Sequence, residues 1–198
     1  DACNNSSAVS QIITVNDTIA PTFVEALPTD STVQCDAVPT AATLTATDNC
    51  GEANVTFEEA IAQGSCPGAY TITRTWTATD ACNNVTAHIQ TITVQDTTVP
   101  VITTQASSIV VECDGSGNQG AVQAWLASNG GAVATDNCSD VTWSNDFDAL
   151  SNDCSAAITV IFTATDACGN TASSSATFTV QDITAPITPE APAALTLA

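Results

Sequence analysis

The chain has 198 residues, of which 44% are apolar and only 11% are charged. It has 21 aspartates and glutamates but only one arginine, Arg74, and no lysine, so the formal net charge is −20 with the single histidine neutral. Such a chain lacks the clustered Lys and Arg side chains that bind nucleic-acid phosphates or anionic membranes, and no apolar run reaches the roughly 20 residues of a membrane-spanning helix.

The sequence repeats itself. The stretch TATDACNNVTAHIQTITVQDTTVP at residues 77–100 has a near copy at residues 163–186, and the chain opens on a third version, DACNNSSAVSQIITVNDTIAP. In each copy a cysteine precedes the linker aspartate by 14 residues: Cys3 and Asp17, Cys82 and Asp96, Cys168 and Asp182. This self-similarity predicts a slice through a tandem array. We expect the final strand of a preceding module at 1–16, complete modules at 17–95 and 96–181, and the first strand of a following module at 182–198.

Within each module the expected elements are short strands rich in Thr, Val and Ile, bounded by Asp, Asn, Gly and Pro. Residues 69–79, AYTITRTWTAT, and residues 156–165, AAITVIFTAT, each alternate a mainly apolar face with a hydroxyl-bearing face. Residues 115–131 place Val122, Trp125 and Leu126 at helical spacing, which predicts a short helix with Trp125 as a plug on the sandwich. The fold prediction is all-β: tandem immunoglobulin-like β-sandwich modules, with a short helix inserted in the second complete module.

Nine cysteines, one histidine and the lack of any C-x-x-C pair indicate disulfides in an oxidising compartment rather than zinc ligands. Threading a module through the sandwich topology places two cysteines at each end. The predicted pairs are Cys35–Cys66, Cys50–Cys82, Cys113–Cys154 and Cys138–Cys168. Cys3 corresponds to Cys82 and Cys168, so we expect its partner to lie outside this window, with a free reactive thiol as the alternative.

The same threading gathers aspartates at one end of each module. The first set is Asp17, Asp48 and Asp80, and the second set is Asp96, Asp136 and Asp166. Two carboxylates about 4 Å apart repel by roughly 1 kcal/mol in water and more where water is excluded, so three together call for a cation.

Oxygen ligands without imidazole or thiolate favour Ca²⁺ over Mg²⁺. Backbone carbonyls, Asn49 and Asn137 are expected to complete the calcium shells. The alternative is that each aspartate caps its own turn through side-chain to backbone hydrogen bonds.

The motifs VECD, ATDNC, FTATDACGN and FTVQDITAP together resemble the hyalin-repeat-like immunoglobulin modules found in tandem in large secreted and cell-surface proteins of Gram-negative bacteria. The resemblance covers essentially the whole chain, with DACNN in place of DACGN at residues 80–84. It implies an extracellular β-sandwich array that serves as a surface fibre, filament or adhesin stalk. Calcium is not implied by the resemblance and rests on the carboxylates alone.

We therefore expect a structural segment of a secreted, calcium-rigidified array whose partners are neighbouring copies of the same repeat, with lateral bundling left open. One alternative is a glycan- or surface-binding module in which Trp76, Trp125 and Trp143 stack on the ligand; another is an accessory array of a larger secreted enzyme. Enzyme activity in this segment is not expected. His88 is interpreted as an exposed strand residue, and aspartates that recur in every module do not form a single active site.

Overall fold

The computed structural model describes residues 2–186. The chain divides into two compact units: unit 1 contains Asp1–Gly64 and Ala69–Gln95, and unit 2 contains Ser65–Gly68 and Asp96–Ala198. Most of the strand predicted at 182–198 lies outside the described residues, and residues 182–186 form no strand.

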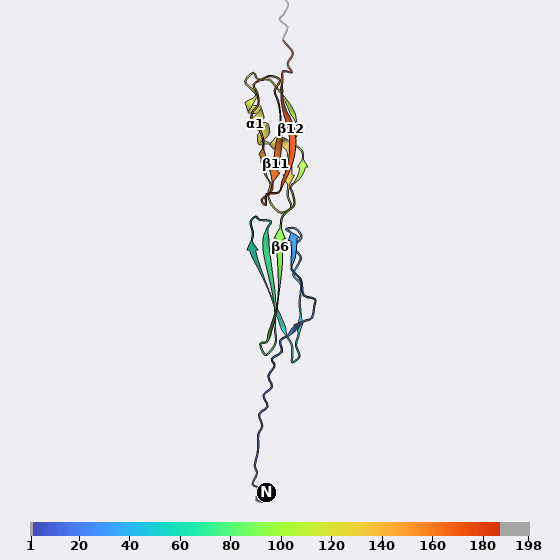
Figure 1. Ribbon diagram of the computed structural model, residues 1–198, viewed down its shortest axis with the longest axis vertical. Coiled ribbons are helices and arrows are strands. Elements are labelled where there is room, and N and C mark those ends of the chain that lie inside the picture. Colours follow the sequence, from blue (N-terminus) through green and yellow to red (C-terminus); the bar gives the residue numbers. More distant parts are fainter. Residues whose placement is uncertain (1, 187–198) are drawn as a thin grey trace, which may run out of the picture. The chain divides into compact units, whose positions relative to one another are not determined.

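Unit 1 consists of two sheets (Figure 1). Its strands are β1 (Thr22–Phe23), β2 (Ser31–Gln34), β3 (Ala46–Thr47), β4 (Asn54–Gln63), β5 (Tyr70–Thr79) and β6 (Val85–Gln95). The smaller sheet pairs β1 with β3, and the larger has the order β2-β6-β5-β4. All neighbours are antiparallel except β2 and β6, which run parallel. The chain thus changes sheets between β1 and β2, as in an immunoglobulin-like β-sandwich.

The predicted alternation of β5 is confirmed. Ile72, Arg74, Trp76 and Ala78 are all buried on one face of the strand, whereas the threonines between them are half-exposed. Arg74 is the one charged member of this face, and its Nε lies 2.8 Å from Glu59 Oε2 on β4. The guanidinium also donates to the Pro39 carbonyl oxygen at 2.8 Å. The buried charge is therefore both paired and hydrogen-bonded.

His88 differs from the expectation of an exposed strand residue. It lies on β6 directly opposite Trp76 in the register of the sheet, is half-buried, and its Nε2 is 2.8 Å from the Pro28 carbonyl oxygen. The physical reason is the period of the strand, because the face that carries Gln90 and Ile92 inward carries His88 inward as well.

Unit 2 repeats this architecture (Figure 1). Its elements are β7 (Val101–Thr104), β8 (Ile109–Glu112), α1 (Gln119–Ala127), the 3₁₀ turn η1 (Asn129–Gly131), β9 (Val133–Thr135), β10 (Thr142–Asn145), β11 (Ala157–Thr165) and β12 (Thr171–Gln181). β7 pairs with β9, and the larger sheet has the order β10-β11-β12-β8, again with a parallel pair, β12 and β8. The all-β, immunoglobulin-like prediction is confirmed.

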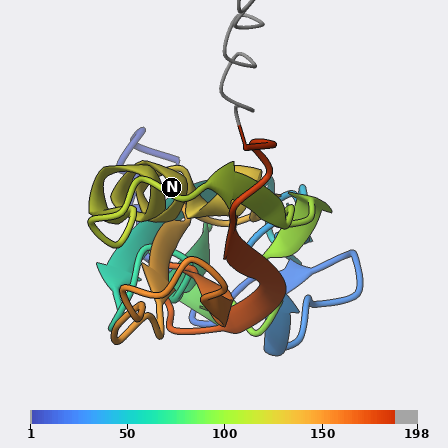
Figure 2. The same cartoon turned by 90° about the horizontal axis from the view of Figure 1, so that it is seen from above.

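The predicted helix in the second module is also confirmed. α1 lies beside the larger sheet of unit 2 (Figures 1 and 2) and buries Val122, Trp125 and Leu126 in its core. The Trp125 ring packs edge-on against Phe162 of β11, with ring centroids 5.2 Å apart, and against Phe178 of β12 at 5.6 Å. The indole N–H donates to the Ser107 carbonyl oxygen at 3.0 Å. Trp125 is therefore a core residue with its single polar group satisfied.

η1 follows α1 and brings backbone close to this core. Gly130 has φ +64°, and a Cβ there would lie 3.0 Å from the Phe162 ring. Glycine suits both the left-handed backbone and the close approach.

Residues 2–16 form no strand here, and the assignment of residues 1–16 to the final strand of a preceding module stays a prediction. Val9 and Val15 are 97% and 88% exposed. A strand needs a neighbour for its backbone N–H and C=O groups, and none of the described strands pairs with this segment.

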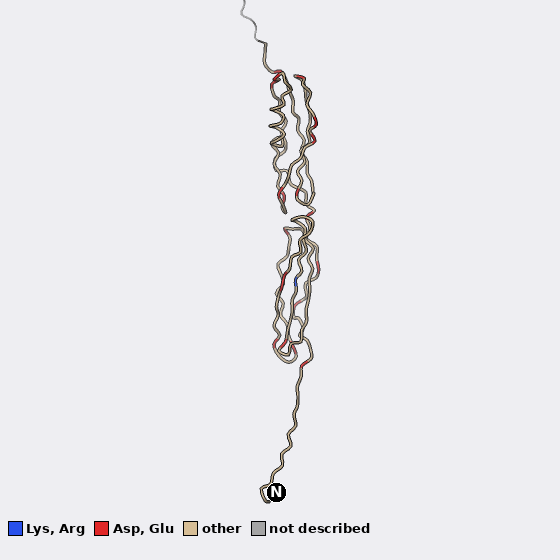
Figure 3. Tube along the Cα trace, turned by 90° about the vertical axis from the view of Figure 1, so that its left-hand side faces the viewer, with Lys and Arg blue, Asp and Glu red and all other residues tan. Residues whose placement is uncertain are grey.

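Acidic residues occur in both units, whereas Arg74 is the only basic residue (Figure 3). No helix among the described residues combines the length and the apolar character needed to cross a membrane.

Candidate functional site

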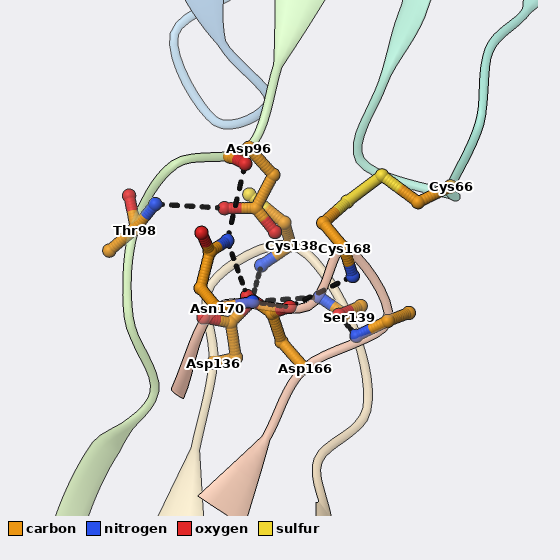
Figure 4. Close-up of a disulfide and its surroundings, with 10 residues drawn as sticks. Cys66, Asp96, Thr98, Asp136, Cys138, Ser139, Asp166, Cys168 and Asn170 are labelled. Carbon is orange, nitrogen blue, oxygen red and sulfur yellow. Dashed lines mark hydrogen bonds between the residues drawn. A yellow bond between two sulfur atoms is a disulfide. The ribbon is translucent and has the colours of Figure 1, made fainter. Parts of the chain in front are cut away.

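The candidate site of unit 2 is built from the linker before β7, the loop after β9 and the loop between β11 and β12 (Figure 4). In the last of these loops, Asp166 organises a tight turn. Its Oδ1 accepts hydrogen bonds from the backbone N–H groups of Cys168 and Asn170, both at 2.8 Å, and its Oδ2 accepts one from Asn170 Nδ2 at 2.7 Å. Asn170 Nδ2 also donates to the Asp96 carbonyl oxygen at 3.2 Å, which fixes the linker to the loop.

Unit 1 contains the same network. Asp80 Oδ1 accepts from the N–H groups of Cys82 and Asn84 at 2.8 Å, and its Oδ2 accepts from Asn84 Nδ2 at 2.8 Å. Asn84 Nδ2 reaches the Asp17 carbonyl oxygen at 3.2 Å. The turn chemistry of the T-D-x-C-x-N motif is therefore reproduced contact by contact in the two units.

These turns set the ionisation of their aspartates. Burial acts in the opposite direction, but the hydrogen bonds from Asn170 and from the backbone of Cys168 and Gly169 together lower the pKa of Asp166. The pKa of Asp80 is lowered in the same way by Asn84 and by the backbone of Cys82 and Asn83, again against the effect of burial. Both groups are carboxylates whose oxygens are held by their own turns.

The remaining aspartates come together as pairs. A carboxylate oxygen of Asp96, a carboxylate oxygen of Asp136 and the Cys138 sulfur all lie within 4.8 Å of one another. Asp17 and Asp48 do the same with the Cys50 sulfur in unit 1. The third predicted ligands, Asp80 and Asp166, belong to neither group.

In each pair, the aspartate that follows the strand has one oxygen engaged and one oxygen free of hydrogen bonds. Asp136 Oδ1 accepts from the N–H groups of Cys138 and Ser139, and Asp48 Oδ2 accepts from the N–H of Cys50 at 2.8 Å. Asp136 Oδ2 and Asp48 Oδ1 are shielded from solvent and have no hydrogen-bond partner among the described residues. An unpaired buried carboxylate oxygen is costly unless a cation approaches it.

The donor set fits a hard cation. Cys138 is disulfide-bonded, so its sulfur is not a thiolate ligand. Cys50 is exposed, but partial loss of hydration and the nearby Asp17 and Asp48 carboxylates raise the pKa of its thiol, so at neutral pH the sulfur is a weak ligand. The carboxylate oxygens of each pair remain, and oxygen atoms of this kind are the ligands that Ca²⁺ prefers. Asn49 and Asn137 are both exposed, and Asn49 Nδ2 lies 3.0 Å from the Cys50 sulfur.

The disulfides correct the predicted pairing. Cys66 is bonded to Cys168, with Cα atoms 5.2 Å apart, although 102 residues separate them in the chain (Figure 4). The predicted pairs Cys35–Cys66 and Cys138–Cys168 are therefore wrong. Cys66 lies in the segment between β4 and β5, and the fold places this segment against the loop between β11 and β12 rather than beside Cys35.

The predicted Cys50–Cys82 pair is not formed either, because both cysteines are free and exposed. Cys113 and Cys154 are bonded to each other, with Cα atoms 5.2 Å apart. Cys35 and Cys138 are also disulfide-bonded. Cys3 is exposed and takes part in neither of the two disulfides given above.

Gly68 explains how the segment that carries Cys66 reaches the site. A Cβ on Gly68 would lie 2.7 Å from the Asp96 Cβ and 3.3 Å from the Cys138 Cβ. Gly68 therefore allows a backbone approach to the carboxylate pair that a larger residue would obstruct.

Residues 23–94 match the family model described as an HYR-like domain with 4 cysteines. Residues 23–94 are an HYR-like domain. The match begins at β1, ends within β6, and includes the four cysteines Cys35, Cys50, Cys66 and Cys82.

Among solved structures, the chain is similar to Drosophila N-cadherin EC1-4, with 14% identity and a TM-score of 0.34, covering 83% of this chain and 50% of that one. It is also similar to the protocadherin GammaB4 extracellular domain, with 15% identity and a TM-score of 0.29, covering 82% of this chain and 33% of that one. The chain thus spans half or less of the length of these two structures. The search of curated proteins gave no match. The HYR-like domain and the disulfides fit an extracellular module.

Several functional residues were not identified from sequence. Asn84 and Asn170 hold the linker to the turn, Ser139 Oγ accepts from the Ala167 N–H at 3.0 Å, and Gly68 makes room for the carboxylate pair. The asparagines had a usable signal, because each stands four residues after the aspartate of its T-D-A-C loop, whereas the T-D-N-C loops have Glu52 and Asp140 there.

Proposed function

We propose that this chain is a structural segment of a secreted array of HYR-like modules, in which Ca²⁺ fixes each linker to the module that follows it. Such an array would serve as a surface fibre, filament or adhesin stalk. The observation that carries the proposal is the buried, unpaired oxygen of Asp136 and of Asp48, each beside the carboxylate of a linker aspartate, in both units.

The role of the ion follows from where its ligands lie in the chain. Asp17 and Asp96 stand at the start of their modules, whereas Asp48 directly follows β3 and Asp136 directly follows β9. A divalent cation would cancel the repulsion between the two carboxylates of each pair and join the linker to the loop. The ion would add to contacts that already join the linker to the module, such as the hydrogen bond from Asn170 Nδ2 to the Asp96 carbonyl oxygen.

A ligand-stacking function has less support. Trp76 and Trp125 are 1% and 5% exposed, and Trp143 is half-buried against the core of unit 2. Aromatic stacking on a glycan needs an exposed ring face, which the buried rings of Trp76 and Trp125 do not offer. We therefore assign the site a mechanical role rather than a recognition role.

The test is calcium binding by calorimetry, combined with thermal melting in a chelator and in Ca²⁺. At a free ion concentration about one hundred times the dissociation constant, each site should add about 2.7 kcal/mol to the free energy of unfolding of its unit. Mg²⁺ should bind more weakly because it demands a stricter octahedral geometry. D136N and D48N should each remove one site.

The matched control is D148N, which makes the same charge change at an exposed position in unit 2. It should leave both the stoichiometry and the calcium-dependent shift of the melting midpoint unchanged. Equal melting midpoints in chelator and in Ca²⁺, with no heat of binding, would overturn the proposal.

A further inference from the structure

The two complete modules carry two cysteines each at the same turns, but in different states. In the second module Cys168 is bonded to Cys66 and Cys138 also belongs to a disulfide, whereas their counterparts Cys50 and Cys82 in the first module are free thiols. The partner of Cys168 is Cys66, which in sequence lies between β4 and β5 of the preceding module. The second module therefore takes its cystine partner from the copy before it.

Cys82 lies in the same kind of turn as Cys168, the cysteine that is bonded to Cys66. Its backbone N–H donates to Asp80 Oδ1 at 2.8 Å, as that of Cys168 donates to Asp166 Oδ1 at 2.8 Å. The next residue has a left-handed backbone in both turns, with φ +66° at Asn83 and +90° at Gly169. The Cys82 thiol is thus held by the same turn as Cys168, and it is exposed.

The other half of such a bond is present at Cys154. Cys154 lies before β11, at the place in the second module that Cys66 has before β5. It is exposed, whereas its partner Cys113 packs against the core of unit 2. A thiolate from another molecule would therefore reach the Cys154 sulfur more readily than the Cys113 sulfur.

We propose that Cys82 of one copy forms a disulfide with Cys154 of a second copy, as Cys66 does with Cys168, so that copies join head to tail. The partner is a second copy of this chain or, in a longer polypeptide, the preceding module. This inference rests on the proposed array for its biological meaning, but it does not depend on calcium.

The chemistry is thiol–disulfide exchange followed by one oxidation. The Cys82 thiolate attacks the Cys154 sulfur, the Cys113–Cys154 bond breaks, and Cys113 leaves as a thiolate. The first step is redox-neutral. Cys113 and Cys50 are then the two thiols left at the junction; a small-molecule disulfide such as glutathione disulfide takes up their two electrons and is released as two thiols. The result is two cystines for each junction.

A head-to-tail bond of this kind uses different surfaces on the two partners, so it does not close on itself and yields open chains. Each copy has a disulfide, Cys113–Cys154, in one module and two free thiols, Cys50 and Cys82, in the other. Oxidation should therefore give a ladder of linear oligomers rather than a single dimer.

The test is incubation of the intact chain in a glutathione redox buffer, with and without Ca²⁺, followed by non-reducing electrophoresis and mass spectrometry of disulfide-linked peptides. We expect a ladder of multimers that collapses on reduction and contains the Cys82–Cys154 peptide pair. C82S should abolish this peptide pair and reduce the ladder at least tenfold. C3S should leave both unchanged, because Cys3 has no part in the proposed bond.

Circular dichroism of C82S checks that the variant is folded, which we expect because Cys82 is exposed and unbonded. The proposal is overturned by any of three results: an intramolecular Cys50–Cys82 cystine, a ladder that C3S removes and C82S does not, or monomers throughout. Calcium binding measured on the same samples is a separate readout. A ladder without calcium binding would refute the proposed calcium clamp alone, and calcium binding without a ladder would refute the disulfide junction alone.

Discussion

At the scale of single residues, aspartates in nearly identical motifs have different environments. Asp166 stands in T-D-A-C-G-N and has both oxygens held by its own turn, whereas Asp136 stands in T-D-N-C-S-D and keeps one buried oxygen unpaired. The difference comes from the residue four positions later. Asn170 can donate a hydrogen bond back to Asp166, but Asp140 has no such donor.

The lowered pKa of Asp166 leads to a prediction about acid stability. A carboxyl group whose pKa is lower in the folded chain than in the unfolded chain stabilises the fold above its unfolded pKa, and this contribution is lost as pH falls through the folded pKa. D166N removes the carboxylate, so the variant should melt at a lower temperature at pH 7 and lose less stability than the wild type below about pH 4.

The measurement is the melting temperature as a function of pH, in chelator so that bound cations do not contribute. D148N is the control with the same loss of charge at an exposed site, and it should track the wild type. Parallel curves for D166N and the wild type would contradict the role given to this turn.

At the scale of elements, α1 supplies unit 2 with a larger core than unit 1 has. The buried cluster of unit 2 includes Val122, Trp125 and Leu126 of the helix together with Phe162 and Phe178 of the sheet. In unit 1 the corresponding cluster is centred on Ile72, Ile92 and Val94. An insertion in the repeat therefore adds apolar burial to one module without changing the order of its strands.

W125A should show how much unit 2 depends on this helix. Truncating a buried tryptophan removes apolar contact and leaves a cavity, so we expect the free energy of unfolding of unit 2 to fall by about 3–5 kcal/mol. The measurement is denaturant unfolding. V110A is the control on β8, where the side chain is 58% exposed, and should change stability by no more than about 0.5 kcal/mol. Equal effects of the two variants would show that α1 does not support the sandwich.

At the scale of the whole molecule, charge is the dominant feature. A net charge of −20 with one basic residue gives the folded chain an unfavourable self-repulsion that mobile ions screen. The Debye length falls from about 30 Å at 0.01 M salt to about 10 Å at 0.1 M. Stability should therefore rise with ionic strength, even when no divalent cation is present.

This expectation is checked by melting the chain in chelator over a series of NaCl concentrations. At pH 7 the melting temperature should increase with NaCl, and near pH 4 the increase should be smaller because many carboxyl groups are protonated. A melting temperature independent of NaCl at pH 7 would show that the acids are too dispersed for their repulsion to matter.

The features that sequence predicted are those that local pattern encodes. The alternation of Ile72, Trp76 and Ala78 predicts a strand with one buried face, and the spacing of Val122, Trp125 and Leu126 predicts a helix packed on a core. Composition alone fixes the acidic character and the cysteine content of the chain. Strand and helix patterns depend only on residues close in sequence, and composition depends on no contacts at all, so a single sequence is enough to derive them.

Tertiary structure decided which cysteines are bonded to each other and which aspartate oxygens are hydrogen-bonded. Cys66 bonds Cys168 across 102 residues because the fold brings the segment Ser65–Gly68 next to the loop between β11 and β12, and no local sequence pattern encodes this contact. Only the positions of the loops decide whether an aspartate oxygen meets a backbone N–H, as in Asp166, or stays buried and unpaired, as in Asp136. Strand and helix follow from short-range periodicity, whereas bonds between distant loops follow from where the fold brings those loops together.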